Sequence, residues 1–269
     1  MPRWLNRLLK GGAKPPGLLL PRARLSLTEA PAAIYAVGDV HGRLDLLVAL
    51  EAKILKDAAR FEGEKLLVML GDYVDRGPNA AQVIDHILSK LPVGLTRYCL
   101  AGNHEIAMLA FLDHPERHSE WLAFGGEETL RSYGIEAPPM KLSSKQVRGL
   151  LDSHIPPEHI DFLRGLPILL ETPGEIFVHA GLTEGVPLAQ QTDDDLIWTR
   201  DDFLSTYAEF GKTVIHGHTP RTEALVSVTR ISIDTGAYAT GKLTAVKLAA
   251  GRPPTFFIET ASHPDRPVR

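Results

Sequence analysis

Cysteine is almost absent from this chain of 269 residues, which contains only Cys99. A single cysteine cannot form an intramolecular disulfide, and it leaves no set of thiolates to hold a structural zinc ion. The chain also lacks any apolar run of about 18 residues, and residues 18–20 are too short for the core of a signal peptide. We therefore expect a protein of a reducing compartment, the cytoplasm, with no membrane span.

Acidic residues are missing from the beginning of the chain, where none precedes Glu29. Six basic residues lie before it, and apolar side chains among the first nine residues have helical spacing. We predict a basic N-terminal tail over residues 1–31 that is mobile or loosely docked. A peripheral contact with a membrane or a partner through residues 1–24 is the alternative interpretation.

The chain as a whole has no excess of positive charge. Its 29 basic and 33 acidic side chains give a net charge of -4, so nucleic acid is not an expected partner. With 44% hydrophobic and 23% charged residues, there is enough apolar material for a globular core. We predict one domain over residues 32–262 and a short C-terminal tail over residues 263–269. The oligomeric state leaves no readable signal.

The first part of the predicted domain repeats a pattern of a buried strand, a turn and a helix. Each apolar segment is followed by residues with helical periodicity, in the pairs 33–37 with 44–58, 65–70 with 83–88, and 97–100 with 106–112. Three successive units of this kind predict a sheet that carries ligands at the carboxyl ends of its strands.

The rest of the domain divides into a helical section and a run of strands. Residues 119–165 predict a small helical cap, in which Ser143 and Gln146 have the spacing of a capping box. One later helix is expected over residues 193–207. The remaining expected strands are 168–170, 176–179, 213–216, 225–228, 231–234, 243–248 and 256–258.

Five short strings place oxygen or imidazole ligands beside glycine, which lets the backbone turn sharply where a strand ends. Asp, Asn and His side chains suit Mn, Fe or Zn, and the lack of thiolates indicates a catalytic rather than a structural site. Together the strings predict a site for two metal ions. In chain order they are Gly38-Asp39-Val40-His41-Gly42, Gly71-Asp72-Tyr73-Val74-Asp75-Arg76-Gly77, Gly102-Asn103-His104-Glu105, His179-Ala180-Gly181 and His216-Gly217-His218-Thr219.

These strings, in this order over residues 33–240, resemble the PPP family of metal-dependent phosphoprotein phosphatases, within the larger group of calcineurin-like metallophosphoesterases. The Ala-Gly pair after His179 and the residues 217–220 are most similar to short bacterial members. The resemblance implies an α/β fold, the αββα sandwich of two mixed sheets flanked by helices. Helices early and strands late in the sequence agree with that fold.

The resemblance also implies which residues bind the metal ions. A carboxylate can bridge two ions because it has two oxygens, whereas an amide oxygen or a neutral imidazole supplies one ligand without adding charge. We expect two divalent ions, with Mn as the ion in assays and Fe or Zn as alternatives. The implied ligands are Asp39 and His41 for one ion, Asn103, His179 and His218 for the other, and Asp72 as the bridge.

The implied mechanism is direct attack on phosphorus by a hydroxide that bridges the two ions, without a covalent enzyme intermediate. His104 is the candidate general acid for the leaving alkoxide, and Asp75 is expected to orient its ring and raise its pKa. Arg76 and Arg200 correspond to the phosphate-binding arginines of the family, whose planar forks suit two oxygens at once, and Asn103 is also assigned to the phosphate. The implied substrate is phosphoserine or phosphothreonine in a protein or peptide.

Four other functions compete with this one. A bis(5'-nucleosyl)-tetraphosphate (diadenosine tetraphosphate) hydrolase or a broad-specificity phosphoesterase would share the metal ligands. The second motif of those tetraphosphate hydrolases typically has Ala where this chain has Asp75, and an anhydride needs less acid assistance than an alkoxide, so Asp75 favours the phosphoprotein. An inactive phosphate-binding module is disfavoured by the complete ligand set. A cysteine-dependent phosphatase is excluded, because Glu105 stands where its arginine would follow Cys99.

Two residues beside the motifs have two interpretations each. His216 could replace His218 as a ligand, but the resemblance aligns His218, so His216 is expected to lie behind the ligands and support them. Tyr238 could line the mouth of the site, although a packed tyrosine is the commoner case.

Overall fold

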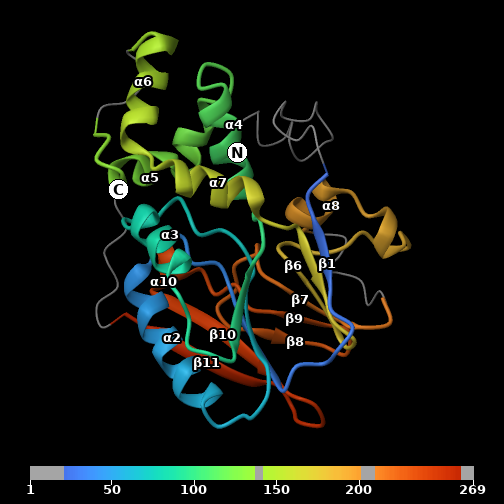
Figure 1. Ribbon diagram of the computed structural model, residues 1–269. Coiled ribbons are helices and arrows are strands. Elements are labelled where there is room, and N and C mark those ends of the chain that lie inside the picture. Colours follow the sequence, from blue (N-terminus) through green and yellow to red (C-terminus); the bar gives the residue numbers. More distant parts are fainter. Residues whose placement is uncertain (1–20, 137–141, 201–209, 262–269) are drawn as a thin grey trace.

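The computed structural model describes residues 21–136, 142–200 and 210–261, which form two β-sheets packed face to face with helices outside (Figure 1). In spatial order, the first sheet contains β11 (Thr255–Thr260), β10 (Lys242–Leu248), β2 (Ala33–Val37), β3 (Lys65–Met69) and β4 (Leu95–Cys99). The second contains β1 (Arg24–Ser26), β5 (Leu169–Glu171), β6 (Glu175–Val178), β7 (Thr213–His216), β9 (Arg230–Ser232) and β8 (Leu225–Val226). The predicted αββα sandwich is confirmed.

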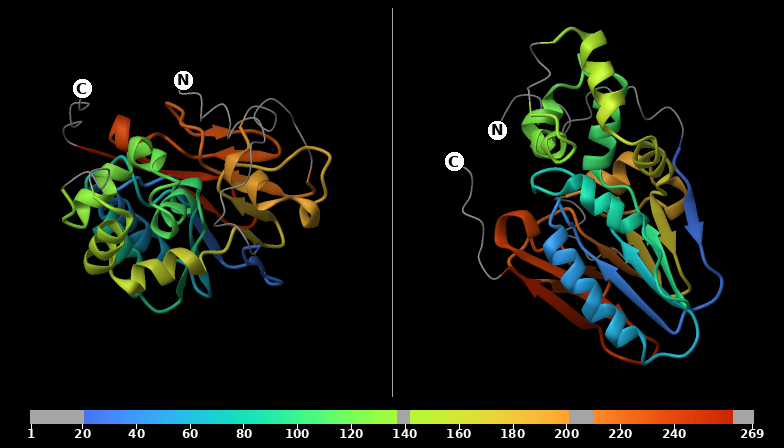
Figure 2. Two further views of the ribbon diagram at one scale, coloured as in Figure 1. Left: turned by 90° about the horizontal axis from the view of Figure 1, so that it is seen from above. Right: turned by 60° about the vertical axis from the view of Figure 1, so that its left-hand side comes forward.

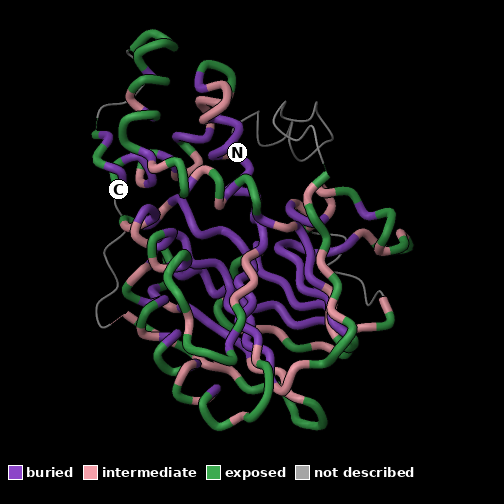
Figure 3. The backbone as a smooth tube through the Cα atoms, in the orientation of Figure 1, coloured by how far each residue is buried: buried purple, intermediate pink, exposed green. Residues whose placement is uncertain are grey.

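The central strands carry apolar side chains on both faces of the sheet, because successive side chains of a strand point to opposite faces. In β2, Ile34 and Ala36 pack in the apolar cluster between the two sheets, whereas Ala33, Tyr35 and Val37 pack under the helices. The inner strands of both sheets are accordingly buried (Figure 3). The other sheet supplies to the same cluster Leu170, Phe177, Ile215 and Ile231.

The three predicted strand-turn-helix units are confirmed. The helices α2 (Leu44–Ala58), α3 (Ala80–Leu88) and α4 (Asn103–Asp113) follow β2, β3 and β4. These strands pair in parallel, so their carboxyl ends lie at one edge of the sheet. The helices α2 and α3 cover its outer face, and α4 rises above that edge (Figure 2). The outer face of the other sheet packs against the short helix α8 (Asp193–Trp198).

A helical section stands over the carboxyl ends of the strands, as predicted (Figure 1). The backbone N–H of Ser143 donates to Oε1 of Gln146 at 3.0 Å, so the predicted capping box is present. The section consists of the π-helix η1 (Leu122–Gly126) and the helices α5 (Glu127–Ser132), α6 (Ser144–His154) and α7 (Pro157–Gly165).

Part of the predicted N-terminal tail belongs to the second sheet. The strand β1 pairs in parallel with β5, and Arg22 donates to the carbonyl of Leu166 at the end of α7 at 2.8 Å. The sequence analysis did not predict this strand. The helix expected over residues 193–207 ends at Trp198, where Thr199 is its C-cap. Residues 1–20, 201–209 and 262–269 lie outside the described residues, so the domain boundaries stay predictions. Among the described residues, no helix is long and apolar enough to cross a membrane.

Candidate active site

All six predicted metal ligands are buried and come together where β2, β3, β4, β6 and β7 end. Oδ1 of Asn103 lies 3.0 Å from Nε2 of His179 and 2.9 Å from Nδ1 of His218, and these two nitrogens are 3.2 Å apart. Oδ1 of Asp72 lies 3.4 Å from Nε2 of His179. On the other side of the carboxylate, Oδ2 of Asp72 lies 3.5 Å from Nε2 of His41.

Two groups of possible metal-binding atoms therefore share the carboxylate of Asp72. His179 and His218 complete one group, His41 and His104 complete the other, and within each group the atoms lie within 4.8 Å of one another. This arrangement matches the predicted bridge in position. His104 lies within this distance of His41 and Asp72, and Asp39 is in neither group.

Asp39 lies beside these groups, where its carboxylate accepts the backbone N–H of His218 at 3.1 Å. Gly217 permits this approach, because a Cβ there would lie 2.0 Å from Oδ1 of Asp39. Burial raises the pKa of Asp39, and the nearby carboxylates of Asp234 and Asp72 raise it further. Asp234 was not predicted as a site residue, although it follows β9 and has Gly236 two residues later, as His179 has Gly181.

The chemistry of these donors fits divalent metal ions. Nδ1 of His41 lies 2.9 Å from the carbonyl of Val74, and Nδ1 of His179 lies 2.9 Å from the carbonyl of Leu70. A carbonyl only accepts, so Nδ1 must carry the hydrogen in both rings, and each Nε2 presents a lone pair toward Asp72. Burial lowers the pKa of both histidines, to about 4 for His179, which favours the neutral form that binds metals.

The backbone is strained at the site. Among the described residues, every non-glycine residue with a positive φ belongs to a predicted motif. L-residues seldom adopt this region, and such conformations persist only where surrounding contacts hold them. The φ angles are 44° at His41, 53° at Asp72, 71° at Asp75, 71° at Arg76 and 66° at His218.

Glu105 holds one of these strained turns. Its Oε2 accepts the backbone N–H groups of Asp72 at 2.8 Å and Gly102 at 2.9 Å, and its Oε1 accepts that of Tyr73 at 2.7 Å. Burial, and to a smaller extent the negative charge of Asp72, raises the pKa of Glu105 to about 7. Glu105 belongs to the third motif, but no role was predicted for it from the sequence.

The two predicted phosphate-binding arginines contact histidines of the site. Nη1 of Arg76 lies 3.1 Å from Nε2 of His41, and Nε of Arg200 donates to Nε2 of His218 at 2.9 Å. The guanidinium of Arg76 also lies over the ring of Tyr238, 4.7 Å from its centroid. Tyr238 is 38% exposed and packs edge-on against His41, so it lines the mouth of the site.

His216 lies where the sequence analysis placed it, outside both groups of possible ligand atoms. It is fully buried at the end of β7, and its Nδ1 lies 3.1 Å from the carbonyl of Gly217. Burial lowers its pKa to about 3, so the ring is neutral.

The predicted acid pair is in contact. Nδ1 of His104 lies 2.6 Å from Oδ2 of Asp75, and both side chains are buried. Nε2 of His104 is buried, has no hydrogen-bond partner among the described residues, and lies 3.9 Å from Oδ2 of Asp72. The expected rise in the pKa of His104 is wrong for the protein without metal ions, because burial, then the charges of His41 and Arg76, lower it.

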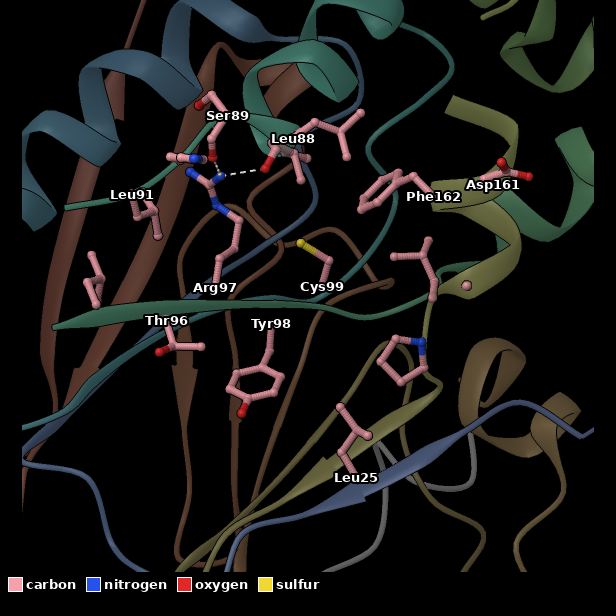
Figure 4. A pocket seen from close by; sticks show the side chains of 16 residues that line it. Leu25, Leu88, Ser89, Leu91, Thr96, Arg97, Tyr98, Cys99, Asp161 and Phe162 are labelled. Carbon is pink, nitrogen blue, oxygen red and sulfur yellow. Dashed lines mark hydrogen bonds between the residues drawn. The ribbon is translucent and has the colours of Figure 1, made fainter. Parts of the chain in front are cut away.

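One cavity in the described residues lies away from these side chains. It is a groove of about 720 Å³ between β4, the end of α3, α7 and β1 (Figure 4). None of the predicted site residues lines it. Arg97 in this groove forms an ion pair with the carboxylate of Glu51 at 2.8 Å, so its charge is compensated.

The family model for calcineurin-like phosphoesterases matches residues 32–248. The chain belongs to this family. It is therefore a hydrolase of the metallophosphoesterase type, and the recognition made from the five motifs is confirmed.

Curated relatives share most of their length with this chain. The bis(5'-nucleosyl)-tetraphosphatase PrpE [asymmetrical] of Oceanobacillus iheyensis is 25% identical over 249 residues, which cover 85% of this chain and 92% of the relative. The protein of the same name from Halalkalibacterium halodurans is 23% identical and covers 78% of this chain and 88% of its own length.

Solved structures share the fold. A crystal structure provisionally described as a diadenosine tetraphosphatase has a TM-score of 0.62 at 20% identity, covering 88% of this chain and 98% of that one. A protein serine/threonine phosphatase from Saccharomyces cerevisiae has a TM-score of 0.52 at 14% identity, covering 91% of this chain and 86% of that one.

Proposed function

We propose that the chain hydrolyses dinucleoside tetraphosphates, with two divalent metal ions held around Asp72. The observation that carries this substrate is the similarity, over 92% of its length, to a relative named as a bis(5'-nucleosyl)-tetraphosphatase. From the sequence, phosphoserine and phosphothreonine were the first predicted substrates and this substrate was the second. The comparisons favour the reverse order.

In this proposal, the donor atoms around Asp72 hold the ions. When bound, two divalent ions polarise phosphoryl oxygens and lower the pKa of a water that attacks phosphorus. Neutral imidazoles and buried carboxylates are the ligand types that Mn, Fe and Zn share, so ligand chemistry does not select one metal. The proposed ligands are Asp39 and His41 for one ion, Asn103, His179 and His218 for the other, and Asp72 for both.

Arg76 and Arg200 are proposed to bind the phosphate chain, together with the amide of Asn103. Each guanidinium now donates to an imidazole nitrogen, Nε2 of His41 or Nε2 of His218. For His41, this is the atom that would bind a metal ion, so metal binding at His41 would release the donor of Arg76. A planar fork with free donors can then bind two phosphate oxygens.

His104 is proposed to protonate the leaving oxygen through Nε2, the buried atom that has no partner among the described residues. Its Nδ1 stays on the carboxylate of Asp75, 2.6 Å away, which orients the ring. This pair supports a second candidate substrate, a phosphoserine or phosphothreonine side chain, because an alkoxide leaving group needs the proton more than a phosphate does.

The test compares diadenosine tetraphosphate with a phosphoserine peptide, using the Mn-loaded chain and an Asp72→Asn control. We expect the tetraphosphate to give ATP and AMP at a higher kcat/KM than the peptide. Preference for the peptide would establish the second candidate. No turnover of either substrate with Mn, Fe or Zn would indicate the inactive phosphate-binding module. We retain the cytoplasm as the proposed location.

A further inference from the structure

The helical section reaches the acid pair with two buried side chains. Nε1 of Trp121 donates to Oδ2 of Asp75 at 2.8 Å. Oγ1 of Thr129 donates to Oδ1 of the same carboxylate at 2.7 Å and accepts the backbone N–H of Asp75 at 2.8 Å. Trp121 is 2% exposed, and Thr129 and Asp75 are fully buried, so water does not replace these donors.

These contacts determine where the carboxylate of Asp75 points. Its Oδ2 is shared between Nε1 of Trp121 and Nδ1 of His104, and its Oδ1 is held by Thr129. Rotation of the carboxylate would break all three hydrogen bonds at once. Since a buried polar group that loses its partner destabilises the fold, the orientation is strongly preferred.

The same section holds the ring of His104 from its face. Phe124 in η1 stacks on this ring with centroids 4.0 Å apart and an angle of 7° between the planes. With Nδ1 held by Asp75 and one face covered by Phe124, the ring directs Nε2 toward the side of Asp72. A backbone contact aligns the section, because the carbonyl of Gly125 accepts the N–H of Arg76 at 3.1 Å.

We propose that Trp121 and Thr129 are positioning residues, which act through Asp75 to align His104 for proton donation to the leaving group. The inference rests on the proposed role of His104 as general acid. In that step the bond between phosphorus and the leaving oxygen breaks, and the proton on Nε2 of His104 forms the new O–H bond. The ring becomes neutral and keeps its Nδ1 hydrogen on Asp75.

The test measures the ratio of kcat for p-nitrophenyl phosphate to kcat for phenyl phosphate, which differ in how much their leaving groups need a proton. We expect Thr129→Val and Trp121→Phe to raise this ratio about tenfold, since positioned general acids contribute about 10²–10⁴-fold to rates. Thr129→Ser keeps the hydroxyl and should retain the wild-type ratio. The ratio does not depend on the folded fraction, so a destabilised variant remains informative.

Thr172→Val is the matched control. The hydroxyl of Thr172 donates to the carboxylate of Glu175 and accepts the backbone N–H of Glu175 at 3.0 Å, the same pattern as in Thr129. Glu175 begins β6, and His179 follows the other end of this strand. Loss of a buried hydroxyl at Thr172 should lower stability and leave the ratio unchanged.

His104→Asn separates failure of this inference from failure of the proposed function. A raised ratio in His104→Asn with unchanged ratios in Thr129→Val and Trp121→Phe would overturn the positioning role alone. An unchanged ratio in His104→Asn would overturn the acid role and the inference with it.

If neither aryl ester is turned over, diadenosine tetraphosphate replaces them. The same variants should then lower kcat and leave KM within about twofold. A change in KM alone, or no turnover of any of the three substrates, would overturn the inference.

Discussion

Oε2 of Glu105 accepts the backbone N–H of Asp72 at 2.8 Å, so a residue of the third motif holds the backbone of the proposed bridging residue of the second. The φ angle of Asp72 is 53°, a conformation that needs such support. A carboxylate suits this position because it only accepts hydrogen bonds when ionised, and all of its neighbours here are N–H donors.

Glu105→Gln should lower both stability and metal affinity. The glutamine NH2 group would face N–H donors, which leaves buried groups unpaired and costs about 1–3 kcal/mol. Loss of a hydrogen bond that orients a metal ligand typically lowers metal affinity about 10–100-fold. Urea unfolding of the metal-free protein at pH 8 and Mn titration measure the two effects. The control Glu127→Gln alters only an exposed pair with Arg131 and should stay within about 0.5 kcal/mol of wild type. Equal stabilities for the two variants would contradict the assigned role.

Asp72→Asn should remove the shared ligand. We expect metal analysis to find two ions per wild-type chain and fewer in the variant, with turnover reduced by at least about 100-fold. EDTA should inactivate the wild type, and added Mn should restore activity and raise the melting temperature, since ligands of the folded state stabilise it. Asp113→Asn, at an exposed residue paired with Arg164, is the control. A wild type that saturates with one ion, or an active Asp72→Asn, would refute the two-metal proposal.

Gly125→Ala should displace η1 from the site. Gly125 has a φ of 117°, and a Cβ there would lie 2.8 Å from the backbone nitrogen of Arg76. We expect a loss of about 1–3 kcal/mol in the free energy of unfolding and at least about a tenfold loss in kcat. Gly149→Ala in α6 is the matched control, because nothing lies within 4 Å of its added Cβ. Gly149→Ala should raise the free energy of unfolding by about 0.5–1 kcal/mol, because alanine favours the helix more than glycine does. Unchanged activity in Gly125→Ala would show that η1 does not need this close approach.

Cys99 should make the protein less stable as the pH rises above about 9. Desolvation raises the pKa of its thiol to about 12 in the folded protein. In the unfolded chain the thiol ionises near pH 8.5, so above that pH the unfolded state releases a proton that the folded state retains. Stability then falls by about 1.4 kcal/mol per pH unit, and Cys99→Ala should lack this contribution. Urea unfolding of both proteins between pH 8 and 10.5 measures the difference; parallel curves would contradict the assignment.

The strand-turn-helix units could be predicted because their signal is local. A continuous apolar run predicted β2 and apolar residues at period 3.6 predicted α2, both with the bounds that the structure has. The Ser143 capping box predicted the start of α6. The strand β1 could not be predicted, because its three residues depend on pairing with β5, which is distant in the sequence. A strand this short carries little local sequence signal, because packing against neighbouring strands largely determines which residues form strands.

The sequence alone determined which donor atoms this protein offers and that they follow strand ends, because parallel strands bring their carboxyl ends to one edge. Only the tertiary structure decided that His104 lies beside His41 and Asp72, that Trp121 and Thr129 reach Asp75, and that burial lowers the pKa of His104. Those features depend on desolvation and on hydrogen bonds between segments far apart in the chain. Neither is encoded in residue spacing, because both arise only when the helical section packs over the sheet edge.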